Sequence, residues 1–266
     1  MTKVGFIGAG NMGSAIMQGI KGSAKAEEIE LYAFDKFQPA LDKAKANGVN
    51  ALADAKAIVK ECKYVFFAIK PQQLEEVLDE VANEVTEDTV IVSILAGVSD
   101  EYYAKRTVEK AKVVLVMPNT PLLLGEGATA LSRNEYVTDK EFSLVCDIFG
   151  STGIYSVIPK DKMKEIIAIN GSSPAFIYLY AQYFIEYAES VGIDKAAATE
   201  LFAKSLTGSA KMITDSGKTL DELITMVSSK GGTTIAGLEQ LRANGLKKAV
   251  DDCCKACTQR AYELSK

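Results

Sequence analysis

Apolar and polar positions follow two different patterns along this chain. Up to about residue 160, short apolar runs recur between longer amphipathic stretches, which is typical of βαβ units and a mostly parallel sheet. The apolar runs predict strands over residues 3–7, 29–34, 63–69, 89–95 and 112–117. A weaker strand, helix and strand complete the predicted sheet over residues 128–132, 140–150 and 153–158.

The remaining stretches predict helices. Four alternate with the strands, several with proline in the first turn or glycine just past the end, over residues 14–22, 39–48, 55–62 and 71–84. From Asp161 onward the strand pattern stops, and breaks separate predicted helices over residues 163–170, 174–192, 194–217, 220–228, 233–245 and 246–266. The stretch 174–192 is apolar on most of its faces, which indicates the middle of a helical bundle or a subunit interface. We therefore expect two domains, residues 1–160 and 161–266, with a boundary that is soft by several residues.

The composition narrows the function classes. Hydrophobic residues make up 48% and charged residues 24% of the 266, as in globular proteins, and a formal net charge of -5 provides no basic surface for nucleic acid. No apolar run approaches the ~18 to 20 residues of a membrane helix, and the N-terminus lacks a signal-peptide pattern. We therefore expect a cytoplasmic protein without a membrane partner. Three of the five cysteines gather as CCKAC, Cys253–Cys257, where helical spacing favours small buried side chains over metal or redox chemistry.

The chain contains no histidine. It therefore has neither an imidazole base nor a histidine-anchored metal, and we expect no metal site. Its chemistry must rely on Lys, Tyr, Ser, Thr, carboxylates, backbone amides or a bound cofactor.

A glycine-rich turn, GAGNMG, follows the first predicted strand and precedes a predicted helix. Gly8 permits a tight turn, Gly10 lets the backbone approach a pyrophosphate, and Gly13 allows close packing of helix on strand. The second predicted strand ends at Asp35, 22 positions after Gly13, where a carboxylate can bind the hydroxyls of the adenosine ribose. This context predicts an α/β fold, in which a Rossmann-type, mostly parallel sheet is followed by an all-helical C-terminal domain. The turn also includes two further predicted cofactor contacts, Asn11 and Met12.

Asp35 also bears on which dinucleotide binds. A carboxylate at this position repels the 2′-phosphate of NADPH and favours NADH. Lys36 beside it weakens that inference. We therefore expect NADH, with NADPH tolerated.

Three further strand ends carry small or rigid residues, which in SILAGV and MPNTP are expected to allow the close approach of a flat nicotinamide ring. The segments AIKPQ, SILAGV and MPNTP end predicted strands, and open parallel sheets bind ligands beyond the carboxyl ends of their strands. Pro71 holds Lys70 extended, which directs it toward the phosphates or the nicotinamide ribose. The alternatives are a solvated loop lysine and ordinary turn chemistry. The cofactor contacts predicted in these segments are Ala68, Ile69, Lys70, Pro71, Ala96, Gly97, Pro118 and Asn119.

A second glycine pair lies in SSKGGTTIAG, Ser228–Gly237. Gly231 and Gly232 provide a bend free of side chains, a following threonine is a suitable helix cap, and the first amides of the helix point toward the bend. We interpret this as a seat for a substrate carboxylate; the alternative is helix capping alone. GSSPA, which opens the long apolar helix, is expected to frame the same pocket. The predicted substrate-binding residues are Ser172, Ser229, Gly231, Gly232, Thr233 and Thr234.

These segments resemble the pyrroline-5-carboxylate reductases nearly end to end, through GAGNMGSAI, AIKPQ, AGV, MPNTP, GSSPA and, most specifically, SSKGGTTIAGLEQL. The resemblance implies hydride transfer from NAD(P)H to the imine carbon of 1-pyrroline-5-carboxylate, giving proline. It also implies a homodimer with intertwined helical domains, often assembled further into a decamer. The chain departs from the family pattern at Leu115, where arginine is usual, and at Lys230, where proline is usual. The positions carried over for cofactor and substrate contact are Asn11, Lys70, Asn119, Gly231, Gly232 and Thr234, with Thr234 and Lys70 as catalytic candidates.

A cyclic imine is basic enough to arrive protonated, which agrees with the absence of histidine. The enzyme then mainly positions two reactants, and orientation can account for ~7 to 11 kcal/mol of a barrier. We expect Thr234 to donate to the substrate and help settle the proton of the ring nitrogen. Two other functions stay open. A β-hydroxyacid dehydrogenase would carry a lysine, with an asparagine four residues later, early in the interdomain helix, and PAFIYLYAQYF has neither. A non-catalytic dinucleotide sensor would need no substrate seat.

Overall fold

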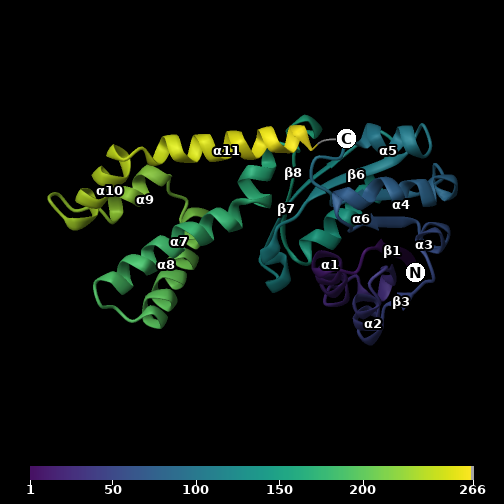
Figure 1. Ribbon diagram of the computed structural model, residues 1–266, viewed down its shortest axis with the longest axis horizontal. Coiled ribbons are helices and arrows are strands. Elements are labelled where there is room, and N and C mark those ends of the chain that lie inside the picture. The colour runs from purple at the N-terminus through teal and green to yellow at the C-terminus, as the bar shows by residue number, and fades with distance from the viewer. Residues whose placement is uncertain (265–266) are drawn as a thin grey trace. The chain divides into compact units, whose positions relative to one another are not determined.

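The computed structural model describes residues 1–264, and its centre is an eight-stranded sheet in the order β3-β2-β1-β4-β5-β6-β7-β8 (Figure 1). Neighbouring strands pair in parallel except β6 and β7, which are antiparallel. The carboxyl ends of the first six strands therefore share one edge, where open α/β folds bind ligands. The strands are β1 (Thr2–Ile7), β2 (Ile29–Phe34), β3 (Asn50–Ala51), β4 (Tyr64–Phe67), β5 (Val90–Ser93), β6 (Lys112–Met117), β7 (Gly127–Arg133) and β8 (Gly153–Val157).

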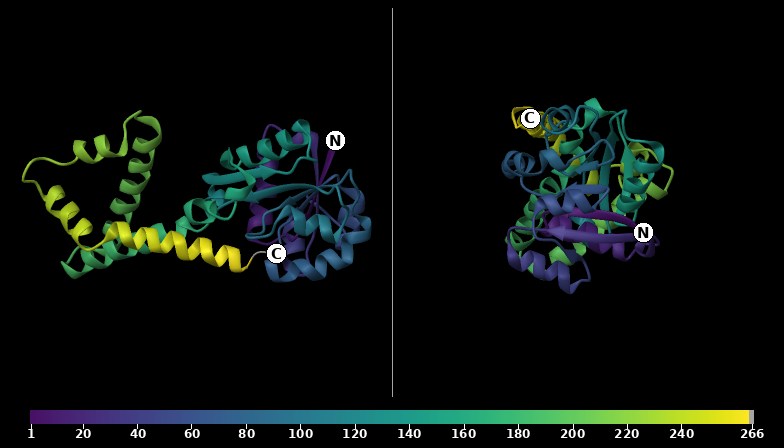
Figure 2. Two further views of the ribbon diagram at one scale, coloured as in Figure 1. Left: turned by 90° about the horizontal axis from the view of Figure 1, so that it is seen from above. Right: turned by 90° about the vertical axis from the view of Figure 1, so that its right-hand side faces the viewer.

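Helices cover both faces of the sheet because successive strand residues point to opposite sides. In β4, Phe66 packs on one face and Phe67 on the other, and both are fully buried. The burial of each such side chain contributes roughly 1.5 to 3 kcal/mol. The first face packs against α1 (Asn11–Lys21), α2 (Gln38–Ala46) and α6 (Asp139–Gly150), and the second against α3 (Ala55–Glu61), α4 (Leu74–Val81) and α5 (Asp100–Arg106). Figure 2 shows these layers from two further directions.

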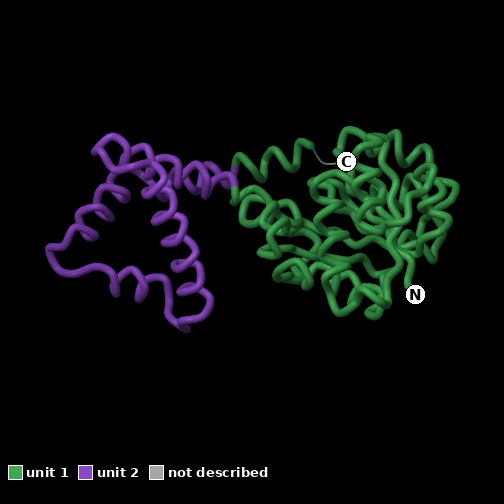
Figure 3. The backbone as a smooth tube through the Cα atoms, turned by 90° about the horizontal axis from the view of Figure 1, so that it is seen from below, with its two compact units in different colours: residues 1–174, 256–266 green, residues 175–255 purple. Residues whose placement is uncertain are grey.

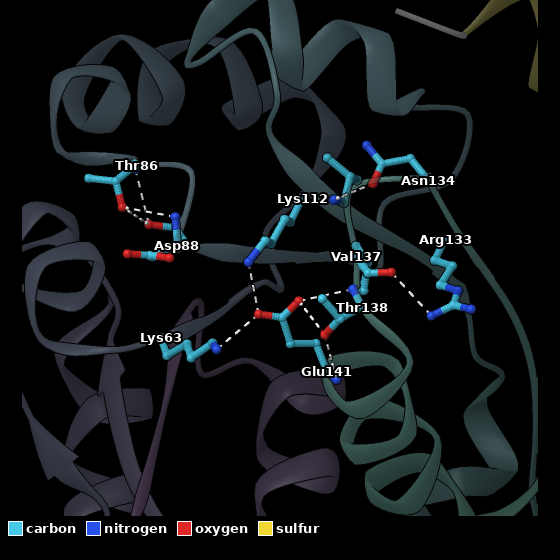
Figure 4. Close-up of polar contacts among 11 residues, drawn as sticks. Lys63, Thr86, Asp88, Lys112, Arg133, Asn134, Val137, Thr138 and Glu141 are labelled. Atoms are coloured by element: carbon cyan, nitrogen blue, oxygen red, sulfur yellow. Dashed lines mark hydrogen bonds and ion pairs between the residues drawn. The ribbon is translucent and has the colours of Figure 1, made fainter.

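The buried carboxylate of Glu141 connects the start of α6 to the edge of the sheet at which β4 and β6 begin. Thr138 and Glu141 form a capping box, and the Glu141 carboxylate also accepts hydrogen bonds from Nζ of Lys63 and of Lys112, each at 2.9 Å (Figure 4). Lys63 directly precedes β4, and Lys112 begins β6. Burial alone would raise the pKa of Glu141, but these hydrogen bonds outweigh it and lower the pKa to about 2.

After residue 160 the chain is helical. A 3-10 turn, η5 (Lys160–Lys162), and a π-helical turn, η6 (Ile167–Gly171), lead into α7 (Ser173–Ser190), α8 (Lys195–Asp215), α9 (Leu220–Met226), α10 (Thr233–Ala243) and α11 (Leu246–Glu263). The chain forms two compact units, residues 1–174 with the chain from 256 onward, and residues 175–255 (Figure 3). The expected domains, 1–160 and 161–266, are divided where the strand pattern of the sequence stops, whereas these units are divided by contacts in the structure. The expected domain boundary therefore stays a prediction.

Within residues 175–255, aromatic rings pack α7 against α8. Phe184 stacks on Phe202 with 4.6 Å between ring centroids, and the Tyr180 ring lies 4.9 Å from that of Phe184. α7 nevertheless exposes many large apolar side chains, among them Ile177, Tyr178, Leu179, Tyr183 and Tyr187. Contiguous apolar surface of this kind usually marks an interface.

The fold class expected from the sequence is confirmed, with a mostly parallel sheet followed by helices. Two short elements, β3 and α5, were not predicted. β3 has only two residues, and the sequence of α5, DEYYAKR, has no run of apolar positions at helical spacing. The helix expected over residues 163–170 forms only in its second half, as the π-helix η6, and turns occupy the first half. Over residues 1–264, none of the helices combines the length and the apolar character that crossing a membrane requires.

Candidate functional site

The glycine-rich turn joins the end of β1 to the start of α1. Gly8 has φ +106°, and a Cβ there would collide with the carbonyl oxygen of Ala68, at the end of β4. A Cβ at Gly13 would collide with the carbonyl oxygen of Gly8. Gly10 has no atom within 4 Å of its Cβ position, so the space above the turn is open. The first and third glycines therefore close the turn, and the second leaves room for a ligand.

The amino terminus of α1 has free backbone donors. Its N-cap is Gly10, which makes no side-chain capping bond, and its first turn contains no acidic residue. Side chains cap several other helices of this chain, namely α3, α5, α6, α8 and α9. Since uncapped first-turn amides and the helix dipole together favour anions, the start of α1 is suited to a phosphate group.

The Asp35 carboxylate is fixed beside this turn by both of its oxygens. Oδ2 accepts a hydrogen bond of 2.7 Å from the backbone N–H of Ala9, and Oδ1 accepts one of 2.8 Å from the N–H of Phe37. The neighbouring Lys36 forms an ion pair with Glu76, with 2.6 Å between Nζ and Oε1. A negative group thus stands at the end of β2, and the neighbouring positive charge is already paired.

A cavity of about 480 Å³ brings many of the predicted cofactor contacts together. Sequence reasoning missed three of its larger side chains, Phe34, Phe37 and Gln73. Only their closeness to Asp35 and Pro71 in the sequence could have indicated them. The predicted residues that line the cavity are Gly8, Gly10, Asn11, Met12, Asp35, Ala68, Ile69 and Lys70.

The other predicted cofactor contacts do not line this cavity. Pro71 begins a 3-10 turn, η2 (Pro71–Gln73), and the Lys70 side chain before it is exposed. Ala96 and Gly97 lie in the loop after β5, and Gly97 lines a second cavity of about 340 Å³.

Pro118 and Asn119 follow β6 and are buried. The side-chain oxygen of Asn119 accepts a hydrogen bond of 2.9 Å from the N–H of Ala128, which fixes the turn after β6. Asn170, which sequence reasoning missed, donates from Nδ2 to the carbonyl oxygens of Met117, at 2.7 Å, and Ala128, at 3.0 Å. These bonds attach η6 to the carboxyl end of β6.

Ser172, from the GSSPA segment, lies just after η6. Its hydroxyl accepts a hydrogen bond of 3.5 Å from Sγ of Cys257 on α11. Cys257 is half-buried and packs against the core. Over residues 1–264, no group of three or more Cys, Asp or Glu side chains is arranged to hold a metal ion.

The second glycine pair forms a tight bend before α10, within residues 175–255. Gly231 has φ +69°, and the N–H of Gly232 donates to the carbonyl oxygen of Ser229 at 2.9 Å. A Cβ at Gly232 would lie 2.9 Å from the backbone carbonyl oxygen of Ser229, a close approach that favours glycine. The bend therefore exists as predicted from the sequence.

The cap of α10 differs from the prediction. We expected Thr233 or Thr234 to cap the helix, but the N-cap is Gly232, and both threonines lie inside the first turn. In the described part of the chain, neither threonine hydroxyl forms a hydrogen bond, and the first turn has no acidic residue. The start of α10 therefore keeps its backbone amides and two hydroxyls for a ligand, as the start of α1 keeps its amides.

Family models match both parts of the chain. The model described as "Pyrroline-5-carboxylate reductase dimerisation" matches residues 160–264, and "NADP oxidoreductase coenzyme F420-dependent" matches residues 3–97.

Individual proteins match along the whole length. A pyrroline-5-carboxylate reductase of Escherichia coli strain K12 is 32% identical over 268 residues, covering 99% of this chain and 98% of that protein. One from Methanosarcina acetivorans is 34% identical over 265 residues, with the same coverage. The crystal structure of Plasmodium falciparum pyrroline carboxylate reductase with NADP bound aligns with a TM-score of 0.87 at 28% identity, covering 100% of this chain and 98% of that one.

Proposed function

The chain belongs to the pyrroline-5-carboxylate reductase family, and on this basis we propose that it reduces 1-pyrroline-5-carboxylate to L-proline with a nicotinamide dinucleotide. The observation that carries the proposal is a shared property of α1 and α10. Both helices start at a glycine N-cap with no side-chain capping bond and no acidic residue in the first turn. Of the two ligands in this reaction, one carries a pyrophosphate and the other a carboxylate, and each suits one such helix start.

The residues around the first cavity fit a dinucleotide. The open space above Gly10 and the free amides of α1 suit a pyrophosphate. The fixed Asp35 carboxylate suits an adenosine ribose. When bound, the reduced nicotinamide supplies the hydride. Lys70, exposed at the rim of the cavity, is a candidate for the charge that meets the phosphates.

The bend at Gly231–Gly232 supports binding of the substrate carboxylate. Amides at the start of α10 and the hydroxyls of Ser229, Thr233 and Thr234 are the donors offered. Each charge-assisted hydrogen bond contributes roughly 1.5 to 3 kcal/mol, so a few of them suffice to hold a small anion. Ser172 is a further candidate for substrate contact, and its hydroxyl also accepts from Cys257.

Proton handling is a modest demand in this reaction. The imine nitrogen arrives protonated, so the chain needs no histidine and its main task is to orient the reactants. Thr234 lies in the first turn of α10 with a hydroxyl that makes no bond within the described residues, and we assign it the hydrogen bond to the substrate.

Asp35 supports NADH as the preferred dinucleotide. Its oxygens are held by Ala9 and Phe37, so the carboxylate is not free to turn away from a 2′-phosphate. Lys36 is paired with Glu76, which reduces the compensation it offers to that phosphate.

The working form is an oligomer. The dimerisation model covers the helical part of the chain, and the exposed apolar face of α7 supports a dimer formed there. A decamer and a cytoplasmic location stay predictions.

The test is a spectrophotometric assay of the purified protein. With 1-pyrroline-5-carboxylate, absorbance of NADH or NADPH at the nicotinamide band should fall, and hydroxyacids with the oxidised dinucleotides should give no signal. Turnover of a hydroxyacid without turnover of the imine would instead support a β-hydroxyacid dehydrogenase. Dinucleotide binding with no turnover of either substrate would support a sensor.

A further inference from the structure

The loop between β5 and α5, residues 94–99, carries the predicted nicotinamide-side contacts Ala96 and Gly97. On one side it borders open space, because Leu95, Gly97, Val98 and Ser99 all line the cavity of about 340 Å³. Leu95 and Val98 nevertheless pack in the core, whereas Ala96 between them is exposed. The position of the loop therefore depends on these two anchors and on how its two ends are held.

The first end is held inside the core. Tyr103, on α5, donates from its hydroxyl to Oγ of Ser93 at 2.8 Å, and Ser93 is the last residue of β5. Both residues are buried, Tyr103 completely. This bond joins α5 to β5, the two elements that the loop connects.

The second end is held by Lys160, 60 residues further along the chain. Its Nζ lies 2.8 Å from Oδ2 of Asp100 and 3.1 Å from Oε1 of Glu101, and these are the first two residues of α5. Asp100 is only 5% exposed, and its other oxygen, Oδ1, is buried without a hydrogen-bond partner in the described structure. Lys160 is therefore the counter-charge of a buried carboxylate, and its removal leaves that charge uncompensated.

The segment that begins with Lys160 also reaches the neighbouring strand end. Ten residues later, Asn170 binds the carbonyl oxygen of Met117 at the end of β6. One connecting segment thus contacts both strand ends that carry the nicotinamide-side contacts. Sequence reasoning gave no indication of this, because Lys160 lies in an exposed turn, remote in sequence from the loop.

We propose that Lys160 is a positioning residue for hydride transfer, which acts through Asp100 and Glu101 to hold the loop 94–99 against the reacting end of the cofactor. The proposal rests on the proposed function. Its physical basis is the sensitivity of hydride transfer to geometry, since a displacement of about 1 Å can cost about 100-fold in rate. Lys160 does not itself contact the reactants in this account.

The test compares three variants of the full-length protein. Lys160→Met removes the charge and keeps the length of the side chain, and Lys160→Arg keeps the charge. Lys162→Met is the matched control, because Lys162 lies on the same turn, is 58% exposed and pairs only with its neighbour Asp161 among the ion pairs of the described residues.

We expect Lys160→Met to lower kcat by about 10-fold or more, while Lys160→Arg and Lys162→Met stay within about threefold of the wild type. The affinity for NADH, measured by fluorescence titration, should change by less than about threefold, since the Asp35 side of the site is untouched. The deuterium isotope effect on kcat, measured with NADH deuterated at C4, should rise in Lys160→Met. A merely structural role would not change that isotope effect.

Hydrogen exchange provides a measurement that does not depend on activity. Peptides covering residues 94–99 should exchange faster in Lys160→Met than in the wild type and in Lys162→Met. If Lys160→Met fails to fold, Asp100→Asn, which keeps the shape and removes the buried charge, should give the same loss of kcat and the same faster exchange. Unchanged exchange in the loop, or a kcat within about twofold of the wild type, would overturn the proposal. A wild-type protein that does not reduce the imine would refute the proposed function, and the exchange data would still decide whether Lys160 holds the loop.

Discussion

At the scale of single residues, the candidate sites are distinguished by glycine N-caps, whereas α3, α5, α6, α8 and α9 have side-chain caps. An aspartate, serine or threonine at Gly10 or Gly232 would bind the first-turn amides itself, as Asp54 does for α3. Glycine leaves those amides to an anion. The residues that then discriminate between ligands are those beside the amides, Asp35 at the first site and Thr234 at the second.

Replacing Thr234 tests the second site. Thr234→Ala removes one hydroxyl from the first turn of α10 and leaves the Gly232 cap unchanged, so we expect kcat/KM for 1-pyrroline-5-carboxylate to fall by about 10-fold or more. Thr199→Ala is the control, because Thr199 is exposed on α8 and its hydroxyl donates to the carbonyl oxygen of Lys195 in the same helix. If Thr234→Ala stays within about threefold of the wild type, its assigned role is wrong.

Replacing Asp35 tests the preference for the dinucleotide. Asp35→Ser removes the negative charge and keeps an acceptor for the N–H of Ala9 or Phe37, so the ratio of kcat/KM for NADPH to that for NADH should rise by about 10-fold or more. Asp42→Ser, an exposed change on α2, should leave the ratio as it is. An unchanged ratio in Asp35→Ser would show that Asp35 does not determine the preference for NADH.

At the scale of elements, the contact of Glu141 with Lys63 and Lys112 should make stability depend on pH. The folded pKa of about 2 lies below the ordinary value of 4.5, so the unfolded chain binds the proton more readily. The stabilisation is therefore fully present above about pH 5 and is lost as the pH falls through 4.5 toward 2.

Urea unfolding of Glu141→Gln across this range provides the check. At pH 7 we expect the variant to lose on the order of 2 to 3 kcal/mol of unfolding free energy, a difference that shrinks as the pH is lowered below about 4.5. Glu135→Gln, at an exposed position in the loop before α6, should differ little from the wild type at every pH. A difference for Glu141→Gln that is constant with pH would contradict this reading of the contact.

Most elements of the sheet could be predicted from the sequence because most strands bury one face or both, although β8 is largely exposed. Seven strands have apolar runs long enough to show a period, whereas β3 consists only of Asn50–Ala51. α5 was missed, although Ser99 as a side-chain cap and Asp100 and Glu101 in the first turn were readable signals. The expected threonine cap of α10 was wrong because Gly232, not a threonine, adopts the extended cap conformation.

The candidate site was only partly predictable, because its motifs are local in sequence and the contacts that hold its loops join distant residues. GAGNMG and the bend at Gly231–Gly232 are short segments whose conformation depends on their own glycines. Lys160 with Asp100 and Asn170 with Met117 join residues more than 50 positions apart, and nothing in the local sequence indicates such pairs. Tertiary contacts of this kind became visible only with the fold.

At the scale of the whole molecule, the exposed aromatic side chains of α7 predict an oligomer. Tyr183 and Tyr187 lie one helical turn apart, 58% and 67% exposed. Sedimentation velocity of the wild type at micromolar concentration should therefore show a dimer or a larger assembly. In the variant with Tyr183→Lys and Tyr187→Lys, two charges would need to be desolvated in the interface, so its sedimentation coefficient should fall on dilution.

Tyr136→Lys is the matched control, because Tyr136 is a partly exposed tyrosine before α6. This variant should sediment like the wild type. A wild-type protein that sediments as a monomer would show that the apolar face of α7 has a different use.

The central claim is that this chain transfers a hydride to the imine carbon of 1-pyrroline-5-carboxylate. The most direct measurement is to run the reaction with NADH deuterated at both C4 positions and to analyse the product by mass spectrometry. The account predicts proline carrying one deuterium at C5, in an amount equal to the NADH oxidised. Failure to form proline, or proline without deuterium, would contradict it.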